Sequence, residues 1–154
     1  MSIRAANGRS AASTMTLGLA LALAALTEFA VAEVPEVGDA DWKAMQTIIA
    51  EQRAALVAGD GDKAFSYATP AIRAQFGDAQ AFMEMVRTGY AALLTARYVE
   101  FLQGAVIDGT VVVPLRLVDS DNTVRVALYV MERQSNGGWR IAGCRIAPST
   151  LQAT

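Results

Sequence analysis

One stretch decides the fold of this chain: residues 110–146 read TVVVPLRLVDSDNTVRVALYVMERQSNGGWRIAGCRI. Within it, residues 110–119 and 123–134 are long runs rich in valine and in other residues that favour strands. Asp119-Ser120-Asp121-Asn122 separates the two runs, and such side chains are typical of tight turns because they bond to nearby backbone groups. The pattern predicts a hairpin of two long strands.

A further strand is predicted on each side of this hairpin. Asn136-Gly137 is a strong signal for a two-residue turn, because both residues tolerate a positive φ. It leads into a last strand at residues 139–146. Residues 96–103, along which two sets of side chains alternate, predict a first strand. We therefore expect the carboxyl half of the chain to form a four-stranded antiparallel meander.

The second long strand has two faces of different character. One face is aliphatic, and the other mixes arginine with alanine, tyrosine and methionine. The first consists of Val124, Val126, Leu128 and Val130, and the second of Arg125, Ala127, Tyr129, Met131 and Arg133. A sheet face in contact with water is usually mostly polar. The mixed face therefore indicates partial cover, by a loop or by a second copy of the chain; scattered surface hydrophobics are the alternative.

Three helices are predicted ahead of the sheet. The first follows a capping Asp39 or Asp41 and ends at Gly59. Its apolar stripe consists of Trp42, Met45, Ile48, Ile49 and Leu56. The second begins at Asp60 or Asp62 and must end before Pro70, because the residue before a proline avoids helical geometry.

A turn is expected at residues 71–76, closed by Gly77, and Asp78 then caps the third helix, which buries Phe82, Val86 and Tyr90 along one face. Helices followed by a meander make an α+β domain, with the helices on one side of an antiparallel sheet. We expect residues 33–41 to form a polar leader, 42–148 a single domain and 149–154 a tail.

Short motifs along residues 42–146 resemble those of a known bacterial family. They are Ile48-Ile49, Gln52, Ala64-Phe65, Ala68 to Arg73, Phe76-Gly77, Phe82, Met85-Val86, Tyr90, Ala127-Leu128-Tyr129, Gly138 to Ile141 and Gly143-Cys144. As a set they are similar to the domain of unknown function 4864, and the order of elements resembles the cystatin-like fold of the nuclear-transport-factor-2-like (SnoaL-like) superfamily. The resemblance implies a fold but no activity, because the family has none assigned. Ala91-Ala92 departs from it, since a proline is expected there.

In that superfamily the helices and the concave sheet face enclose a conical pocket, lined by apolar groups with a few polar ones. The resemblance implies a pocket in this chain whose lining would be Tyr67, Phe76, Phe82, Val86, Tyr90, Phe101 and Trp139. The alternative is that these side chains fill the core and leave no space, because aromatic residues at regular spacing usually belong to a core.

Glu100 and Tyr98 are the candidate catalytic pair, because they lie two residues apart on one strand face. If that face is interior, they could transfer a proton as in a cofactor-free isomerase or hydratase of the ketosteroid-isomerase type. If it is outward, Glu100 is solvated, since charged side chains are seldom buried without a partner. Isomerases of this fold place an aspartate on the sheet interior, and the sequence offers no convincing counterpart.

Composition excludes several chemistries. The chain has no histidine and one cysteine, Cys144, so an intramolecular disulfide, Ser-His and Cys-His pairs and imidazole metal sites are all impossible. Residues 33–154 carry 14 acidic and 11 basic side chains, unlike the strongly basic surface of a nucleic-acid-binding domain. We therefore predict no metal, no cofactor and no nucleic-acid partner.

Cys144 has two interpretations. Strict alternation along the last strand places it opposite Trp139 and Ile141. It could be a small apolar filler, as buried free cysteines often are, or it could link two subunits in an oxidising compartment.

The first 32 residues are predicted to be a cleavable signal peptide. Arg4 and Arg9 precede an apolar run at residues 15–26, and Ala30-Val31-Ala32 is the small-x-small pattern that a signal peptidase cuts, leaving Glu33 first. An uncleaved anchor is the alternative, but a spanning helix needs about 20 apolar residues. The mature protein would be periplasmic or secreted, with no stable membrane span.

The sequence thus favours an exported binding or interaction module over an enzyme. Its partner would be a small apolar ligand in the cone or a second copy that packs through the sheet. Two alternatives stay open, namely a cofactor-free isomerase or hydratase and a structural homodimer module of the envelope.

Overall fold

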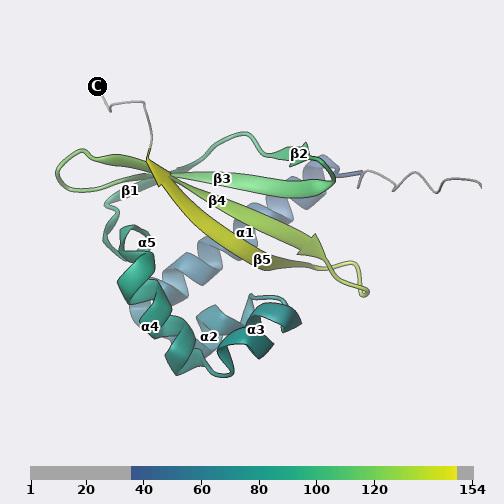
Figure 1. The fold of residues 1–154 in the computed structure, drawn as a ribbon. Helices are drawn as coiled ribbons and strands as arrows, with labels where there is room; N and C mark the ends of the chain where they lie inside the picture. Colours follow the sequence, from purple (N-terminus) through teal and green to yellow (C-terminus); the bar gives the residue numbers. More distant parts are fainter. Residues whose placement is uncertain (1–35, 149–154) are drawn as a thin grey trace, which may run out of the picture. The chain divides into compact units, whose positions relative to one another are not determined.

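The structure, a computed structural model, describes residues 36–148. Helices come first along the chain: α1 (Asp39–Ala58), α2 (Gly61–Ser66), α3 (Pro70–Phe76), α4 (Ala79–Gly89) and α5 (Ala91–Thr95). Strands follow: β1 (Tyr98–Phe101), β2 (Ala105–Ile107), β3 (Thr110–Val118), β4 (Val124–Arg133) and β5 (Trp139–Pro148). The helices lie on one side of a curved antiparallel sheet (Figure 1), which confirms the α+β class. The predicted signal peptide, with its cleavage site at Ala30, Ala32 and Glu33, and the tail lie outside the described residues.

The sheet has the strand order β1-β3-β4-β5, and β2 pairs with the same edge of β3 as β1 does. The predicted strand at 96–103 is therefore shorter than expected and is followed by an extra one, which corrects the number of strands from four to five. Pro114 of β3 has no N–H to donate to this edge, although its carbonyl oxygen accepts from Leu102 N at 3.0 Å. Gly104 lies so close to Trp42 that an added Cβ would come within 2.3 Å of the ring. The predicted edge strand is therefore divided into β1 and β2, with residues 102–104 between them.

Side-chain caps begin three of the helices. Asp60, Thr69 and Asp78 each accept a hydrogen bond from the backbone N–H three residues ahead, at 3.1, 3.3 and 2.8 Å. The prediction of a turn at residues 71–76 is corrected, because Thr69 as cap and Pro70 as first residue start the short helix α3. Helix α5 has no counterpart among the predicted elements.

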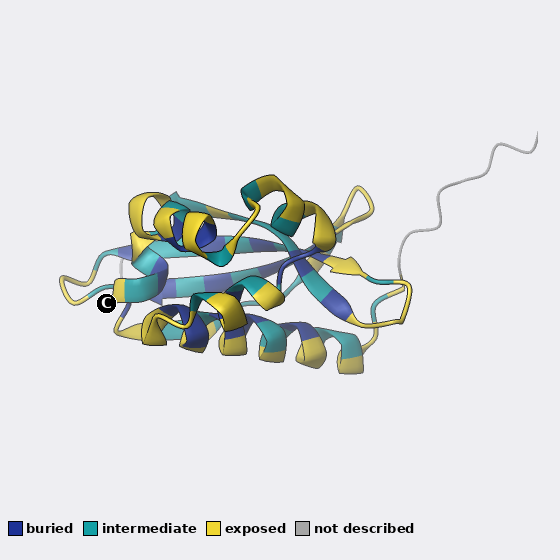
Figure 2. Ribbon diagram, turned by 90° about the horizontal axis from the view of Figure 1, so that it is seen from below, coloured by how far each residue is buried: buried dark blue, intermediate teal, exposed yellow. Residues whose placement is uncertain are grey.

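The helices cover the mixed face of β4, where Ala127, Tyr129 and Met131 are buried in the core. Figure 2, seen from the helical side, shows buried residues both on the helices and on the strands behind them. The aliphatic residues Val126 and Leu128 are only half-buried and lie on the other face. The expectation that the mixed face lacks full cover is therefore wrong. Alternation separates the two sets of side chains, but both sets are apolar enough to be buried, so hydrophobicity cannot choose between them.

A bulge in β5 changes the face of its second half. The register shifts between Val130 and Met131, because Ala142 of β5 has no partner across the ladder. Strict alternation would place Cys144 opposite Trp139. This prediction is corrected, since the extra residue returns Cys144 to the face that packs on the helices.

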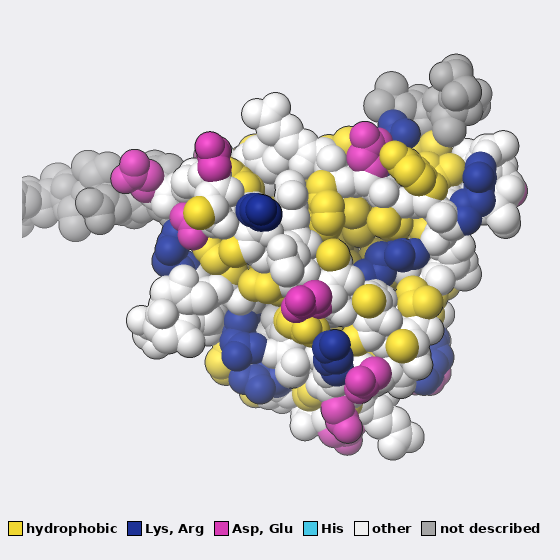
Figure 3. All heavy atoms as spheres, turned by 180° about the vertical axis from the view of Figure 1, so that it is seen from behind, with side chains coloured by type: hydrophobic (Ala, Val, Ile, Leu, Met, Phe, Trp, Pro, Cys, Tyr) yellow, Lys and Arg dark blue, Asp and Glu magenta, His cyan; other side chains and the backbone are white. Residues whose placement is uncertain are grey.

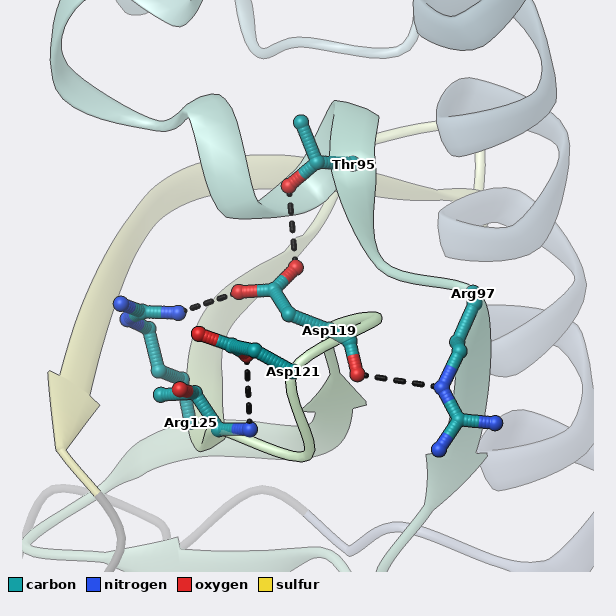
Figure 4. Close-up of polar contacts among 6 residues, drawn as sticks. Thr95, Arg97, Asp119, Asp121 and Arg125 are labelled. Carbon is teal, nitrogen blue, oxygen red and sulfur yellow. Dashed lines mark hydrogen bonds and ion pairs between the residues drawn. The ribbon is translucent and has the colours of Figure 1, made fainter.

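The turn between β3 and β4 is tied to neighbouring elements by Asp119 (Figure 4). Its carboxylate accepts a hydrogen bond from Thr95 Oγ1 at 2.9 Å and forms an ion pair with Arg125. Its backbone carbonyl oxygen accepts from Arg97 Nε at 3.1 Å. Thr95 ends α5 and Arg97 directly precedes β1, so one residue joins the hairpin to both elements.

Candidate functional site

A cavity of about 280 Å³ lies between the helices and the inner face of the sheet. Its lining is mostly apolar and comes from α1, the α2–α3 connection, α3, α4, α5, β4 and β5. The residues are Gln52, Leu56, Ala68, Ile72, Gln75, Phe76, Phe82, Met85, Val86, Tyr90, Leu93, Tyr129, Ile141, Gly143 and Cys144. Because Gln75 is exposed and Met85 is half-buried, the cavity reaches solvent near α3 and α4.

Hydrogen bonds hold the free edge of β5 against the helical layer. Thr69 N donates to Ile141 O, and Ile141 N donates to Tyr67 O, each at 2.9 Å, so the α2–α3 connection runs parallel to β5. Tyr90 OH donates to Cys144 O at 2.8 Å. These bonds fix the distance between the sheet and the helices on this side of the cavity.

A cluster of three phenylalanine rings supports another wall. The ring of Phe82 lies 5.2 Å from that of Phe65 and 5.8 Å from that of Phe76, and the second pair meets edge to face at 77°. Such pairs stabilise beyond the area they bury. They connect α2, α3 and α4 and keep the rings of Phe76 and Phe82 at the cavity surface.

Two deeply buried polar side chains reach this lining. Tyr129 is 1% exposed, and its hydroxyl has no hydrogen-bond partner within residues 36–148. Gln52 is 3% exposed, and its Nε2 donates to Ala64 O at 3.3 Å. A buried polar group without a partner costs about 1–3 kcal/mol, so the Tyr129 hydroxyl is the unusual feature of the cavity.

The cavity is electrically neutral at ordinary pH. Burial raises the pKa of the Cys144 thiol to about 12, and burial also raises the pKa of Tyr129 well above its usual value. Neither group ionises near pH 7, and a protonated thiol is a poor nucleophile. The remaining side chains of the lining carry no charge.

Four of the seven predicted lining residues reach the cavity: Phe76, Phe82, Val86 and Tyr90. The other three are placed elsewhere. Tyr67 donates its hydroxyl hydrogen to Glu51 at 3.0 Å, and Phe101 packs against the core from β1 without reaching the cavity. Trp139 is buried with its indole N–H donating to Asp41.

Trp139 belongs to a cluster that joins β5 to the start of α1. Its Nε1 donates to Asp41 Oδ1 at 2.9 Å, and the guanidinium of Arg133 lies 4.5 Å from the ring centroid. Hydrogen bonds from Trp139 and Arg133 lower the pKa of the Asp41 carboxyl. Asp41 also accepts from the N–H of Gly38, which is the N-cap of α1 in place of the predicted Asp39 or Asp41. This cluster is structural and lies apart from the cavity lining.

The lining residues missed by the pattern analysis are those whose position depends on packing. Gln52 interrupts the apolar stripe of α1, and a polar residue at a core position was its only signal. Tyr129 lies on the face of β4 that was not expected to be the core. Cys144 reaches the cavity only because of the bulge at Ala142.

Glu100 and Tyr98 lie on the outer face of the sheet and do not line the cavity. The carboxylate of Glu100 is 3.3 Å from the guanidinium of Arg116, and the Glu100 side chain is 44% exposed. Tyr98 is also exposed. The structure therefore does not bring the candidate catalytic pair to the interior position that proton transfer would need.

Charged side chains of both signs are interspersed over the face shown in Figure 3, with hydrophobic side chains between them. Several arginines of the sheet are paired locally: Arg116 with Glu100, Arg125 with Asp119 and Arg133 with Asp41. Within residues 36–148, no helix is long and apolar enough to cross a membrane. The same residues contain no cluster of three side chains able to hold a metal ion.

Residues 38–154 match the model of a family described as domain of unknown function (DUF4864). The chain belongs to this family. The match begins one residue before α1, so this DUF4864 domain includes every helix and strand described above and every residue that lines the cavity. No curated protein and no solved structure matches the chain.

Proposed function

We propose that this DUF4864 domain is an exported binding module, without catalytic activity, that holds one small, uncharged and mostly apolar molecule in its cavity. The observation that carries the proposal is the cavity of about 280 Å³, which has apolar walls and a lining tyrosine whose buried hydroxyl has no partner among the described residues. Small-molecule sites are typically apolar concavities with a few polar groups.

The size of the cavity limits the ligand. An apolar cavity of about 150 Å³ accommodates one benzene molecule, so this one suits a compact bicyclic molecule or a chain of similar volume. Its lining carries no charged side chain that would compensate the desolvation of an ion. A carboxylate or an ammonium ligand is therefore disfavoured.

A binding role is favoured over an isomerase or hydratase because the cavity offers no side chain suited to proton transfer near neutral pH. General acid–base catalysis needs a side chain whose pKa lies near the working pH. The thiol and the phenol of the cavity have raised pKa values, and Glu100 lies on the other face of the sheet.

The proposal is tested by filling the cavity. Val86 lines the cavity, so Val86→Phe should reduce the affinity for the neutral fluorophore N-phenyl-1-naphthylamine by about tenfold or more, because an added ring occupies the space that the probe needs. The measurement is fluorescence titration of the folded variants.

Val57→Phe is the matched control. Val57 is 55% exposed on α1, so the same substitution there should leave probe binding unchanged. Equal affinity of the wild-type protein and Val86→Phe, or no saturable binding to the wild-type protein, would remove the proposal.

The export part of the proposal rests on the sequence. The positive residues, the apolar run and the small-x-small pattern before Glu33 support cleavage and a periplasmic or secreted protein. Mass spectrometry of the protein from its native cells should find a mature chain that begins at Glu33. A chain that retains Met1 would contradict it.

A homodimer is the second candidate role, favoured by the outer face of the sheet. There a shallow groove has an apolar floor formed by Ile107, Val112, Pro114, Leu128 and Val130. Asp108 lies at its β2–β3 edge and Arg145 at its β5 edge. If two copies pack face to face with parallel strands, the acidic edge of each copy meets the basic edge of the other.

The dimer is tested by light scattering. The wild-type protein should have the mass of a dimer, and Leu128→Lys, which places a charge in the apolar floor, should have the mass of a monomer. A wild-type protein that is monomeric at high concentration rules out this role and leaves the ligand proposal untouched.

A further inference from the structure

We infer that the hydroxyl of Tyr129 is the polar anchor of the cavity, and that it donates a hydrogen bond to a carbonyl or ether oxygen of the bound molecule. The inference rests on the proposed function and narrows its ligand class. The ligand would be a compact apolar molecule with one acceptor oxygen, such as an aryl ketone.

The position of Tyr129 supports this role. It lies in the middle of β4, directly across the ladder from Cys144, and its ring is on the core face. Tyr129 is one of the residues that line the cavity, and its buried hydroxyl has no partner within residues 36–148. Of the other polar groups in the lining, the carbonyl oxygen of Cys144 accepts from Tyr90, and the amide Nε2 of Gln52 donates to Ala64 O.

The chemistry of the hydroxyl selects an acceptor. Tyr129 remains protonated, because burial disfavours the phenolate, and its hydrogen needs an acceptor that residues 36–148 do not supply. The positive charge of Arg53 also acts on Tyr129, against the effect of burial on its pKa. A ligand oxygen with partial negative charge fits this field better than a ligand donor.

The hydroxyl groups of Tyr90 and Tyr129 differ in whether they already have a hydrogen-bond partner, and this difference distinguishes a ligand anchor from a structural tyrosine. Tyr90 also lines the cavity, but its hydroxyl is bonded to Cys144 O at 2.8 Å. Tyr90→Phe removes an existing intramolecular bond, whereas Tyr129→Phe removes a hydroxyl without one. Without ligand, Tyr90→Phe should lower Tm, and Tyr129→Phe should leave it unchanged or raise it.

The test uses two ligands of the same shape. 2-Acetylnaphthalene has a carbonyl oxygen where 2-isopropenylnaphthalene has a methylene group, and the affinity of each is measured by displacement of N-phenyl-1-naphthylamine. The wild-type protein should bind the ketone roughly tenfold more tightly than the alkene, because only the ketone pairs the buried hydroxyl. Tyr129→Phe should bind the two with equal affinity and should lose affinity only for the ketone.

Results that differ from these expected affinities overturn the inference. Equal affinity of the wild-type protein for the two ligands means that Tyr129 contributes no hydrogen bond, as when a water molecule satisfies its hydroxyl; the cavity proposal then stands. The same holds if Tyr129→Phe weakens both ligands alike. If neither ligand displaces the probe, the inference is wrong. Whether the probe itself binds decides the broader proposal of a ligand cavity. The wild-type comparison needs no variant, so it remains valid even if a variant fails to fold.

Discussion

Leu115→Ala is expected to reduce the free energy of unfolding by about 2–5 kcal/mol, the range for deleting a buried leucine side chain from a core. Leu115 is in the middle of β3, is 1% exposed and packs in the cluster that joins the sheet to the helices. The rigid sheet cannot collapse onto the space that alanine leaves. Urea unfolding followed by circular dichroism measures the loss.

Leu128→Ala is the matched control, because it makes the same change on the adjacent strand. Leu128 is half-buried on the outer face and is absent from the core cluster. Its replacement should cost less than about 1 kcal/mol, since little buried apolar area is lost. A greater loss for Leu128→Ala than for Leu115→Ala would mean that the aliphatic face of the sheet is the more deeply buried one, under the helices or in the dimer.

Asp119→Ala is expected to have the next largest effect, a loss of about 1–3 kcal/mol, because two donors lose their acceptor at once. Its side chain is only 19% exposed and accepts from Thr95 while pairing with Arg125 (Figure 4). The end of the β3–β4 hairpin would separate from α5. Thermal unfolding measures the loss, and hydrogen exchange should show faster opening of the Thr95 and Arg125 region.

Ser120→Ala controls for this prediction. Ser120 is exposed in the same turn and none of the hydrogen bonds of the hairpin involves its side chain, so its replacement should change stability by less than about 0.5 kcal/mol. Asp119→Asn keeps an acceptor for Thr95 but removes the charge that pairs with Arg125, and it should fall between the two. Equal stability of Asp119→Ala and Ser120→Ala would show that the contacts of Asp119 contribute nothing.

Local signals predicted the elements well where they depend on neighbours in sequence. Gly59 ends α1 with a φ of 73°, and Asp60 and Asp78 cap the helices that follow. The turn at residues 119–122 joins β3 and β4 as expected. Pro70, which was expected only to end a helix, also begins α3 with Thr69 as its cap, because proline is tolerated at the first helical position.

The cavity was predicted only in part, because its lining comes from elements that are distant in sequence. Phe82, Val86 and Tyr90 recur along one face of α4 and its end, so helical periodicity found them. Tyr129 and Cys144 required knowledge of which strand face the helices cover and of where the ladder shifts its register. Neither is a property of a short segment.

By itself, the amino-acid sequence determined the α+β class, with helices before strands, several of the turns and the exclusion of imidazole chemistry. It did so because caps, turns and periodicity act over a few residues. The tertiary structure alone decided which face of β4 is the core, that the bulge at Ala142 turns Cys144 inward, and that a cavity with Tyr129 in its lining remains between helices and sheet. Alternation along a strand defines two faces, but it does not say which face the helices cover. A cavity depends on how closely side chains from separate elements pack together, and no short segment of sequence contains that information.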